Sequence, residues 1–290
     1  MLGLPGIWRT VHAVLFYLTL AVGLGGLLGH APVLWHLGCR ARKGPFNLYL
    51  LHLAAADALF LACQVGFSVA QAALGSAQDP LHFAVTFLWF AAGLWLLATF
   101  AAERCLSDIL PGCYARCRPR HTTAVLCALV WALTLPAVLL PAEACGLLGR
   151  RPRPLACLRL HAASIAWLVA LAGVACGAGL ALFLWVACCS RRPRPRFYGV
   201  LLASVLPLPF CGLPFVLYWS LRPLLDFLLP VFPPLAALLA CISSSSRPLV
   251  YFVVGRQPGK REPLQAVLQR ALEEAATLDV GGLSLPMGRV

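Results

Sequence analysis

The chain has 290 residues, of which 61% are hydrophobic and 11% are charged, and its formal net charge is +13. Soluble domains are roughly half apolar and about a quarter charged, so this composition excludes a soluble globular enzyme and a disordered chain. The basic residues stand in short segments between long apolar ones, which indicates a multi-pass membrane protein and not a nucleic-acid-binding domain.

Seven apolar segments follow one another, and each reaches the length of about 20 residues that a membrane-spanning helix needs. They cover residues 11–37, 45–70, 81–106, 122–140, 160–188, 198–220 and 227–254. Backbone groups in lipid find no water to bond, so spans of this length predict helices, and the alternating pattern of a membrane β-barrel is not seen. We therefore expect an all-α membrane protein, a bundle of seven transmembrane helices over residues 11–254, with a short N-terminal segment, 1–10.

The tail, residues 255–290, begins with a helix-breaking cluster at 255–259. Apolar residues then recur at helical spacing: Leu264, Val267, Leu268, Ala271 and Leu272. This spacing predicts a short amphipathic eighth helix over about 262–272, lying on the inner surface of the membrane.

Lys and Arg are distributed unevenly between the two sides of the bundle. Fifteen stand in the tail and in the loops after the first, third and fifth spans, against six on the other side. Cytoplasmic segments carry the excess of Lys and Arg, so the sequence predicts an outside N-terminus and a cytoplasmic C-terminus.

Ionisable residues inside spans are costly in lipid and are candidates for function. Asp57 stands in the second span, and Glu103, Arg104 and Cys105 stand at the inner end of the third. Asp108 lies four residues beyond Arg104 on the same helical face, so the two side chains can pair. The alternative interpretations are a polar contact between helices for Asp57 and an arginine that reaches the membrane surface for Arg104.

Two proline motifs mark the sixth and seventh spans. Pro214 follows Cys211 and Gly212, and because proline lacks an N–H it predicts a kink in the sixth helix. Arg247 precedes Pro248 late in the seventh span, and Tyr251 follows one turn later. Membrane helices also tolerate proline without any role in function.

Several motifs stand in these spans in a fixed order: Leu53-x3-Asp57, Glu103-Arg104-Cys105, Trp131, Cys211-x-x-Pro214 and Pro248-x-x-Tyr251. Together with the seven spans, they resemble a rhodopsin-like G-protein-coupled receptor. The segments at 103–107, 118–121 and 210–214 resemble the Mas-related receptors more narrowly.

The resemblance implies a plasma-membrane receptor that passes the signal of an extracellular peptide or small molecule to a heterotrimeric G protein. It implies that the sixth helix swings about Pro214 and that the G protein docks near Arg104, with Pro248 and Tyr251 taking part in activation. Gly212 is then the switch position, where most such receptors have a tryptophan. The resemblance also suggests a role in sensory neurons, in pain or itch.

Three positions depart from the general receptor pattern. His30 stands where the family usually has Asn in the first span, and Arg247 stands where it usually has Asn or Asp before the proline of the seventh span. In the family these positions surround Asp57, in a pocket that often holds sodium. We expect Asp57 and Arg247 to form a buried ion pair with His30 nearby, so that the guanidinium takes the place of the cation. Arg194 is basic where many receptors have a carboxylate, so Glu103 or Asp108 would have to hold Arg104.

The resemblance to Mas-related receptors implies a disulfide between Cys145 and Cys157, at the outer ends of the fourth and fifth spans. Basic residues gather in the loop between these spans: Arg150, Arg151, Arg153 and Arg159. We therefore expect this end to favour an anionic ligand and to repel a basic one. The candidate ligand-binding residues are Glu143, Arg159, His161 and Asp226.

Two other classes of protein remain open at this stage. A transporter would carry inverted repeats or broken helix pairs, and we find no internal repeat. A membrane protein with the receptor fold but without G-protein coupling, such as a modulator or dimer partner, is left open by His30, Arg194 and Arg247.

The chain carries no motif for catalysis or for a bound cofactor, so the sequence predicts neither an enzyme nor a cofactor. Cys113, Cys117 and His121 are spaced by four residues, but three ligands are too few for a structural zinc site. We expect free thiols there, and no metal site.

Overall fold

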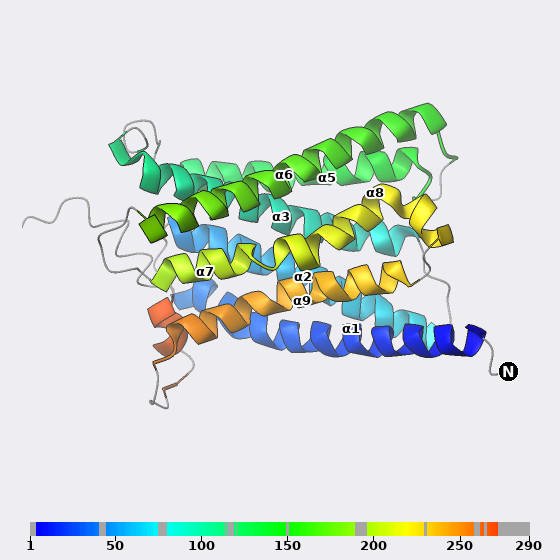
Figure 1. Cartoon of the computed structure of the whole chain (residues 1–290), viewed down its shortest axis with the longest axis horizontal. Helices are drawn as coiled ribbons and strands as arrows, with labels where there is room; N and C mark the ends of the chain where they lie inside the picture. The colour runs from blue at the N-terminus through cyan, green and yellow to red at the C-terminus, as the bar shows by residue number, and fades with distance from the viewer. Residues whose placement is uncertain are drawn as a thin grey trace, which may run out of the picture.

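The computed structural model describes residues 4–40, 45–74, 80–112, 114, 119, 121–148, 151–188, 196–228, 231–257, 262–263 and 266–271. The elements in chain order are α1 (Leu4–Trp35), η1 (His36–Arg40), α2 (Pro45–Leu74), α3 (Pro80–Ile109), α5 (Thr122–Ala144), α6 (Pro154–Cys188), α7 (Arg196–Val205), η2 (Leu208–Gly212), α8 (Leu213–Leu228) and α9 (Phe232–Gly255). In these ranges, seven helical segments are long and apolar enough to cross a membrane. The predicted seven-helix bundle is confirmed (Figure 1).

The helices run side by side along the long axis of the molecule (Figure 1). We call the end that holds the start of α1 the N-terminal end, and the opposite end, beside the tail segment 262–271, the tail end. Helix α3 is the most central helix of the bundle. Of the residues in its apolar 18-residue window, 72% are buried, against 17% for α1. Large apolar side chains such as Leu28, Phe210 and Val253 are about three-quarters exposed, as expected of surfaces that face lipid.

Several helix boundaries differ from the predicted ones; helix α1, for example, begins at Leu4, inside the predicted N-terminal segment 1–10. Helix α6 begins at Pro154 and not at residue 160, because proline fits the first turn of a helix, where its missing N–H has no partner to lose. Arg159, predicted to line a loop, is therefore part of α6. Helix α9 begins at Phe232 and not at 227, while residue 227 still belongs to α8.

The sixth span is broken over a longer stretch than the single predicted kink. Helix α7 ends at Val205, and residues Leu208–Gly212 form the π-helix η2. Pro207 and Pro209 remove two backbone donors here, and Pro214 removes a third just beyond. The backbone N–H of Leu213 bonds the carbonyl of Leu208, which is the five-residue step of a π-helix. The three prolines together therefore place a hinge between α7 and α8.

Helix α1 packs closely against α9 because a glycine lies at the contact. A Cβ at Gly26 would lie 2.1 Å from Oγ of Ser245 and 2.8 Å from Cδ1 of Leu61. The Ser245 hydroxyl in turn donates a hydrogen bond of 3.1 Å to the carbonyl of Val22. Small residues let membrane helices approach in this way, so van der Waals contact and the serine hydrogen bond hold α1 to the bundle.

Replacing Gly26 by alanine should lower the free energy of unfolding by about 1–3 kcal/mol, because the new methyl group overpacks the α1–α9 contact. Gly25 is the matched control, since a Cβ there would meet nothing within 4 Å. Gly25→Ala should be neutral or slightly stabilising, as alanine favours helix more than glycine does. Thermal unfolding of the two purified variants checks this, and equal unfolding temperatures would contradict it.

The tail segment returns to the bundle at the end of α9. Residues 266–271 are helical, and Val267, Leu268 and Ala271 are buried. Arg270 donates hydrogen bonds of 2.6 and 3.0 Å to the Glu262 carboxylate. The apolar face of this segment is therefore covered by protein, where the sequence predicted a face turned to the membrane surface.

Candidate functional site

A buried ion pair joins α2 to α9. Nη1 of Arg247 donates hydrogen bonds to both carboxylate oxygens of Asp57, and the two side chains are 5% and 4% exposed. Either charge alone would be costly at this depth, and each offsets much of the desolvation of the other. The ion pair that the sequence predicted is present.

The guanidinium of Arg247 already neutralises Asp57, so the pair has no need of a further cation. Gly93 of α3 faces it, and a Cβ there would lie 3.7 Å from Oδ1 of Asp57 and 4.0 Å from Nη1 of Arg247. Both carboxylate oxygens already accept hydrogen bonds from a positive group. The residues around Asp57 therefore do not fit the sodium ion that the family resemblance suggests.

His30 completes this polar cluster by replacing a hydrogen bond that α9 loses. Pro248 has no N–H to bond the carbonyl of Ser244, four residues earlier. Nε2 of His30, from α1, donates to that carbonyl over 3.1 Å, and the histidine is 1% exposed. The sequence predicted that His30 lies near the pair, but it did not reveal this role.

Replacing His30 by alanine should cost about 1–3 kcal/mol of stability, because the buried carbonyl of Ser244 then has no donor. His30→Gln is the matched variant, since its amide keeps an N–H of similar reach and should recover part of the loss. Thermal unfolding of both variants checks this. If alanine and glutamine were equally stable at this position, the hydrogen bond would have no such role.

At the tail end, Glu103 and Arg104 contact different neighbours. The guanidinium Cζ of Arg104 lies 5.0 Å from the ring centroid of Phe46 on α2. The hydroxyl of Tyr114 donates a hydrogen bond to Oε1 of Glu103. The predicted restraint of Arg104 by Glu103 or Asp108 stays a prediction, and Arg194 lies outside the described residues.

The other motif residues of this end line up along α3 and α9. Cys105 and Asp108 are half-buried on α3, and Tyr251 is buried on α9, one turn beyond Pro248. Of the cysteines weighed for zinc, Cys113 and Cys117 lie outside the described part of the chain.

Gly212, the predicted switch position, lies where η2 meets α8. A Cβ here would lie 2.7 Å from Cδ1 of Leu208 and 3.5 Å from Cζ of Phe90. These two side chains occupy the space that a larger residue would need. Two turns farther along α8, Trp219 is buried and stacks on Phe87 of α3, with ring centroids 4.3 Å apart and planes at 2°. The sequence did not reveal this contact between α3 and α8, the half of the sixth span nearer the N-terminal end.

A cavity of about 310 Å³ lies at the N-terminal end, between α1, α2, α3, α8 and α9. It is lined by polar side chains of the first three helices and by aromatic side chains of α3 and α8. Of the candidate ligand-binding residues, Glu143, Arg159 and His161 do not line it, and the side chain of Asp226 lies outside the described part. Glu143, Arg159 and His161 belong to α5 and α6, and neither helix is among those that line the cavity.

The disulfide between Cys145 and Cys157 is present, with 4.7 Å between the Cα atoms. A glycine turn at the end of α5 positions it. Gly146 has a φ of 79°, its N–H bonds the carbonyl of Glu143, and the N–H of Leu147 bonds the carbonyl of Ala142. This pairing is a Schellman motif, which ends α5 and turns the chain toward α6.

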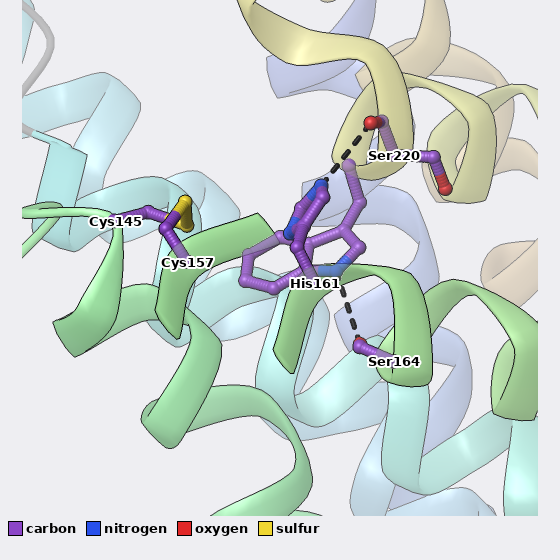
Figure 2. Close-up of a disulfide and its surroundings, with 6 residues drawn as sticks. Cys145, Cys157, His161, Ser164 and Ser220 are labelled. Carbon is purple, nitrogen blue, oxygen red and sulfur yellow. Dashed lines mark hydrogen bonds between the residues drawn. A yellow bond between two sulfur atoms is a disulfide. The ribbon is translucent and has the colours of Figure 1, made fainter. Parts of the chain in front are cut away.

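One turn beyond the disulfide, His161 joins α6 to α8 (Figure 2). Its Nε2 donates a hydrogen bond of 3.1 Å to the carbonyl of Ser220. Beside it, Nε1 of Trp219 donates to Oγ of Ser164 over 3.3 Å. These contacts occupy the space between α6 and α8, whereas Arg159 is exposed and Glu143 is half-buried.

Comparison with known proteins shows to which family the chain belongs. No family profile matches the chain. It is 67% identical to the human Mas-related G-protein coupled receptor member G over 288 residues, 99% of each chain, and 56% identical to the rat member G over the full length of both. It is 38% identical to the human member X1 over 277 residues, covering 93% of this chain and 86% of the relative. The seven-helix bundle and these identities together show that the chain belongs to the Mas-related G-protein-coupled receptors.

Proposed function

We propose that the chain receives an extracellular ligand at the N-terminal end and activates a heterotrimeric G protein at the tail end, in the plasma membrane. One observation carries this proposal: the sixth span is hinged at η2, between the cavity and the end that holds Arg104. Helix α8 lines the cavity on one side of the hinge, and α7 continues on the other. A ligand that contacts α8 can therefore bias the position of α7, which is how binding shifts a two-state equilibrium.

Two independent features support the proposed direction across the membrane. In the sequence, the excess of Lys and Arg stands in the tail and in the segments after the first, third and fifth spans, as expected of the cytoplasmic side. The disulfide lies at the N-terminal end, and disulfides persist in oxidising compartments such as the cell exterior. Both support an extracellular cavity and a cytoplasmic Arg104.

The proposed roles of the tail-end residues follow from their places. Arg104 contacts the G protein from α3, beside Cys105, while Glu103 or Asp108 restrains it. Pro214 and Gly212 belong to the hinge, and Pro248 and Tyr251 adjust the end of α9. The proposal includes a role in sensory neurons, which is supported by the family resemblance alone.

The test is nucleotide exchange on purified heterotrimers of each G-protein class, with the receptor in lipid vesicles and without added ligand. At least one class should exchange faster with the receptor than without it, and Arg104→Ala should remove most of this gain. Arg40→Ala, at the same end in η1, is the matched control and should keep it. An unchanged rate with every class would contradict coupling.

A second candidate function is a receptor fold that does not couple. The Asp57–Arg247 ion pair favours it, because a charged bond between α2 and α9 resists rearrangement of the bundle. Exchange that stays at the background rate in the receptor, and that rises in the double variant Asp57→Asn/Arg247→Gln, would assign the chain to this class.

A further inference from the structure

One face of α2 presents polar side chains to the cavity at the N-terminal end. Gln64, Ser68 and Gln71 follow one another at intervals of four and three residues, so they share one face of the helix, and all three line the cavity. Gln64 is 9% exposed and Ser68 is 5% exposed. Neither of these two side chains forms a hydrogen bond with the part of the chain that the structure describes. Buried polar groups in folded proteins nearly always have partners, so the partners here must come from an occupant of the cavity.

Two threonines of α1 and α3 can only accept hydrogen bonds from such an occupant. Thr19 and Thr86 line the cavity and are buried. The hydroxyl of Thr19 donates to the carbonyl of Leu15 over 2.7 Å, and that of Thr86 donates to the carbonyl of His82 over 2.9 Å. A hydroxyl has one hydrogen to donate, so both hydrogens are used within their own helices and only the oxygen lone pairs remain. The two threonines therefore require donors on the occupant.

The amide of Gln64 adds the need for an acceptor, because it offers two N–H donors and one carbonyl. A primary carboxamide also carries two N–H donors and one carbonyl. It can exchange two hydrogen bonds with Gln64, and its second N–H is then left for Ser68 or a threonine. A carboxylate only accepts, so it would leave the Gln64 carbonyl and both threonines without a donor. An ammonium only donates, so it would leave the N–H groups of Gln64 without an acceptor.

The size and walls of the cavity limit the rest of the ligand. Its volume of about 310 Å³ is at the small end for ligand pockets. Aromatic side chains form much of the wall: Phe16, Phe83, Phe215 and Tyr218. The space therefore suits a compact apolar or aromatic group and excludes a folded peptide, although the last residue of a peptide can enter.

We propose that this cavity binds a compact neutral ligand with a primary carboxamide, with the carboxamide on Gln64 and its polar neighbours and the apolar body among the aromatic side chains. This inference rests on the proposed receptor function and names the ligand class of that function. The carboxamide can belong to a free small molecule or to the amidated C-terminus of a short peptide.

Hydrogen-bonding capacity, and not charge, selects this ligand. Arg222 also lines the cavity, but its guanidinium already has contacts within the chain, among them the ring of Phe83, whose centroid lies 5.1 Å from its Cζ. The anionic ligand expected from the sequence rested on the basic residues between the fourth and fifth spans. The described ones do not line the cavity: Arg151, Arg153 and Arg159. These residues therefore give no reason to expect an anion in the cavity.

The walls of the cavity connect the ligand to the hinge. Phe215 belongs to α8, so an occupant that fills the cavity contacts both α2 and the half of the sixth span nearer the N-terminal end. Phe215 also contacts Phe60 and Phe90, with ring centroids 5.8 and 5.1 Å away. Cζ of Phe90 in turn lies 3.5 Å from the position of a Cβ at Gly212. Phe215 therefore links the site to the hinge through direct contacts.

The experiment measures binding to the purified full chain in detergent, without a G protein. A thiol-reactive dye follows thermal unfolding, because Cys127 and Cys241 are free and buried in the folded chain. The probes are 3-phenylpropanamide, its N,N-dimethyl derivative and 3-phenylpropionate, which share one apolar body. We expect the primary amide alone to raise the unfolding temperature, because the dimethyl amide and the carboxylate have no N–H donor. Equal shifts from the two amides, or no shift from the primary amide, would overturn the proposal.

The variant Gln64→Leu removes the amide at similar size. It should weaken binding of the primary amide by at least about tenfold. Without ligand, the variant should unfold at the same or a higher temperature, because the buried amide has no partner in the described chain to lose. A merely structural Gln64 would give the opposite result, a lower unfolding temperature with unchanged affinity, and that result would overturn the proposal.

Two further variants and their controls locate the site. Thr86→Val should weaken the amide by about threefold or more, while Thr99→Val should leave it unchanged, since Thr99 also donates to its own helix but does not line the cavity. Ala237→Phe fills the cavity from α9 and should abolish the shift, while Leu235→Phe, exposed on the same helix, should keep it. Retained binding in both Thr86→Val and Ala237→Phe would place the amide elsewhere and overturn the proposal.

Two last arms separate the source of the carboxamide and the fate of the receptor proposal. A Gly-Gly-Phe tripeptide amide that binds more tightly than 3-phenylpropanamide, and loses binding when its C-terminus is a free carboxylate, assigns the site to amidated peptide ends; the reverse order assigns it to free small amides. Nucleotide exchange is measured separately. Binding without exchange contradicts the coupling and supports the carboxamide site, whereas exchange without binding does the opposite.

Discussion

Replacing Asp57 by asparagine should lower the free energy of unfolding by about 3–5 kcal/mol and sharply reduce the receptor at the cell surface. The substitution keeps the size of the side chain but leaves the guanidinium of Arg247 buried without its counter-charge, and breaking a buried ion pair from one side costs this much. Thermal unfolding of the purified chain and surface labelling of intact cells measure the two effects.

The double variant Asp57→Asn/Arg247→Gln separates the pair from its parts. It should cost clearly less than the sum of the two single variants, because no unpaired charge remains, and the charge swap Asp57→Arg/Arg247→Asp should recover part of the surface expression. Glu262→Gln is the control, since the Glu262–Arg270 pair is more exposed and should contribute at most about 1 kcal/mol. Additive single costs would show that the two charges do not depend on each other.

Replacing Cys145 by serine should cost about 2–4 kcal/mol, because the disulfide to Cys157 restricts the unfolded chain between α5 and α6. Cys157→Ser should cause the same loss, and the two changes together should cost no more than one. Cys39→Ser, at an exposed free cysteine of η1, should leave the unfolding temperature unchanged.

Thermal unfolding with and without reductant gives the measurement. Reductant should lower the stability of the native chain and leave the Cys145→Ser variant unaffected. Mass spectrometry of non-reduced peptides tests the bond itself, and free thiols at both Cys145 and Cys157 would contradict the account.

The sequence predicted those features that local chemistry determines. Each span was visible because lipid requires a long run of apolar residues, and the ion pair was visible because a carboxylate and a guanidinium inside spans need partners. Asp57 and Arg247 are 190 residues apart, and the family resemblance brought them together before the structure did. The disulfide also came from that resemblance.

The features that the sequence left unpredicted depend on packing between helices. The carbonyl of Ser244 needs a donor because of Pro248, but only the arrangement of α1 beside α9 shows that His30 supplies it. The cavity lies between α1, α2, α3, α8 and α9 because His161 and Trp219 occupy the space between α6 and α8. The break in the sixth span extends beyond the kink expected at Pro214 because earlier prolines remove further donors.

The central claim, a receptor whose cavity and Arg104 end face opposite sides of the cell membrane, is tested most directly by labelling both termini. Short epitope tags are placed at residue 1 and after residue 290, and antibodies are applied to intact and to permeabilised cells. The account predicts that the N-terminal tag is labelled on intact cells and that the C-terminal tag is labelled only after permeabilisation. Labelling of both tags on the same side of the membrane would contradict it.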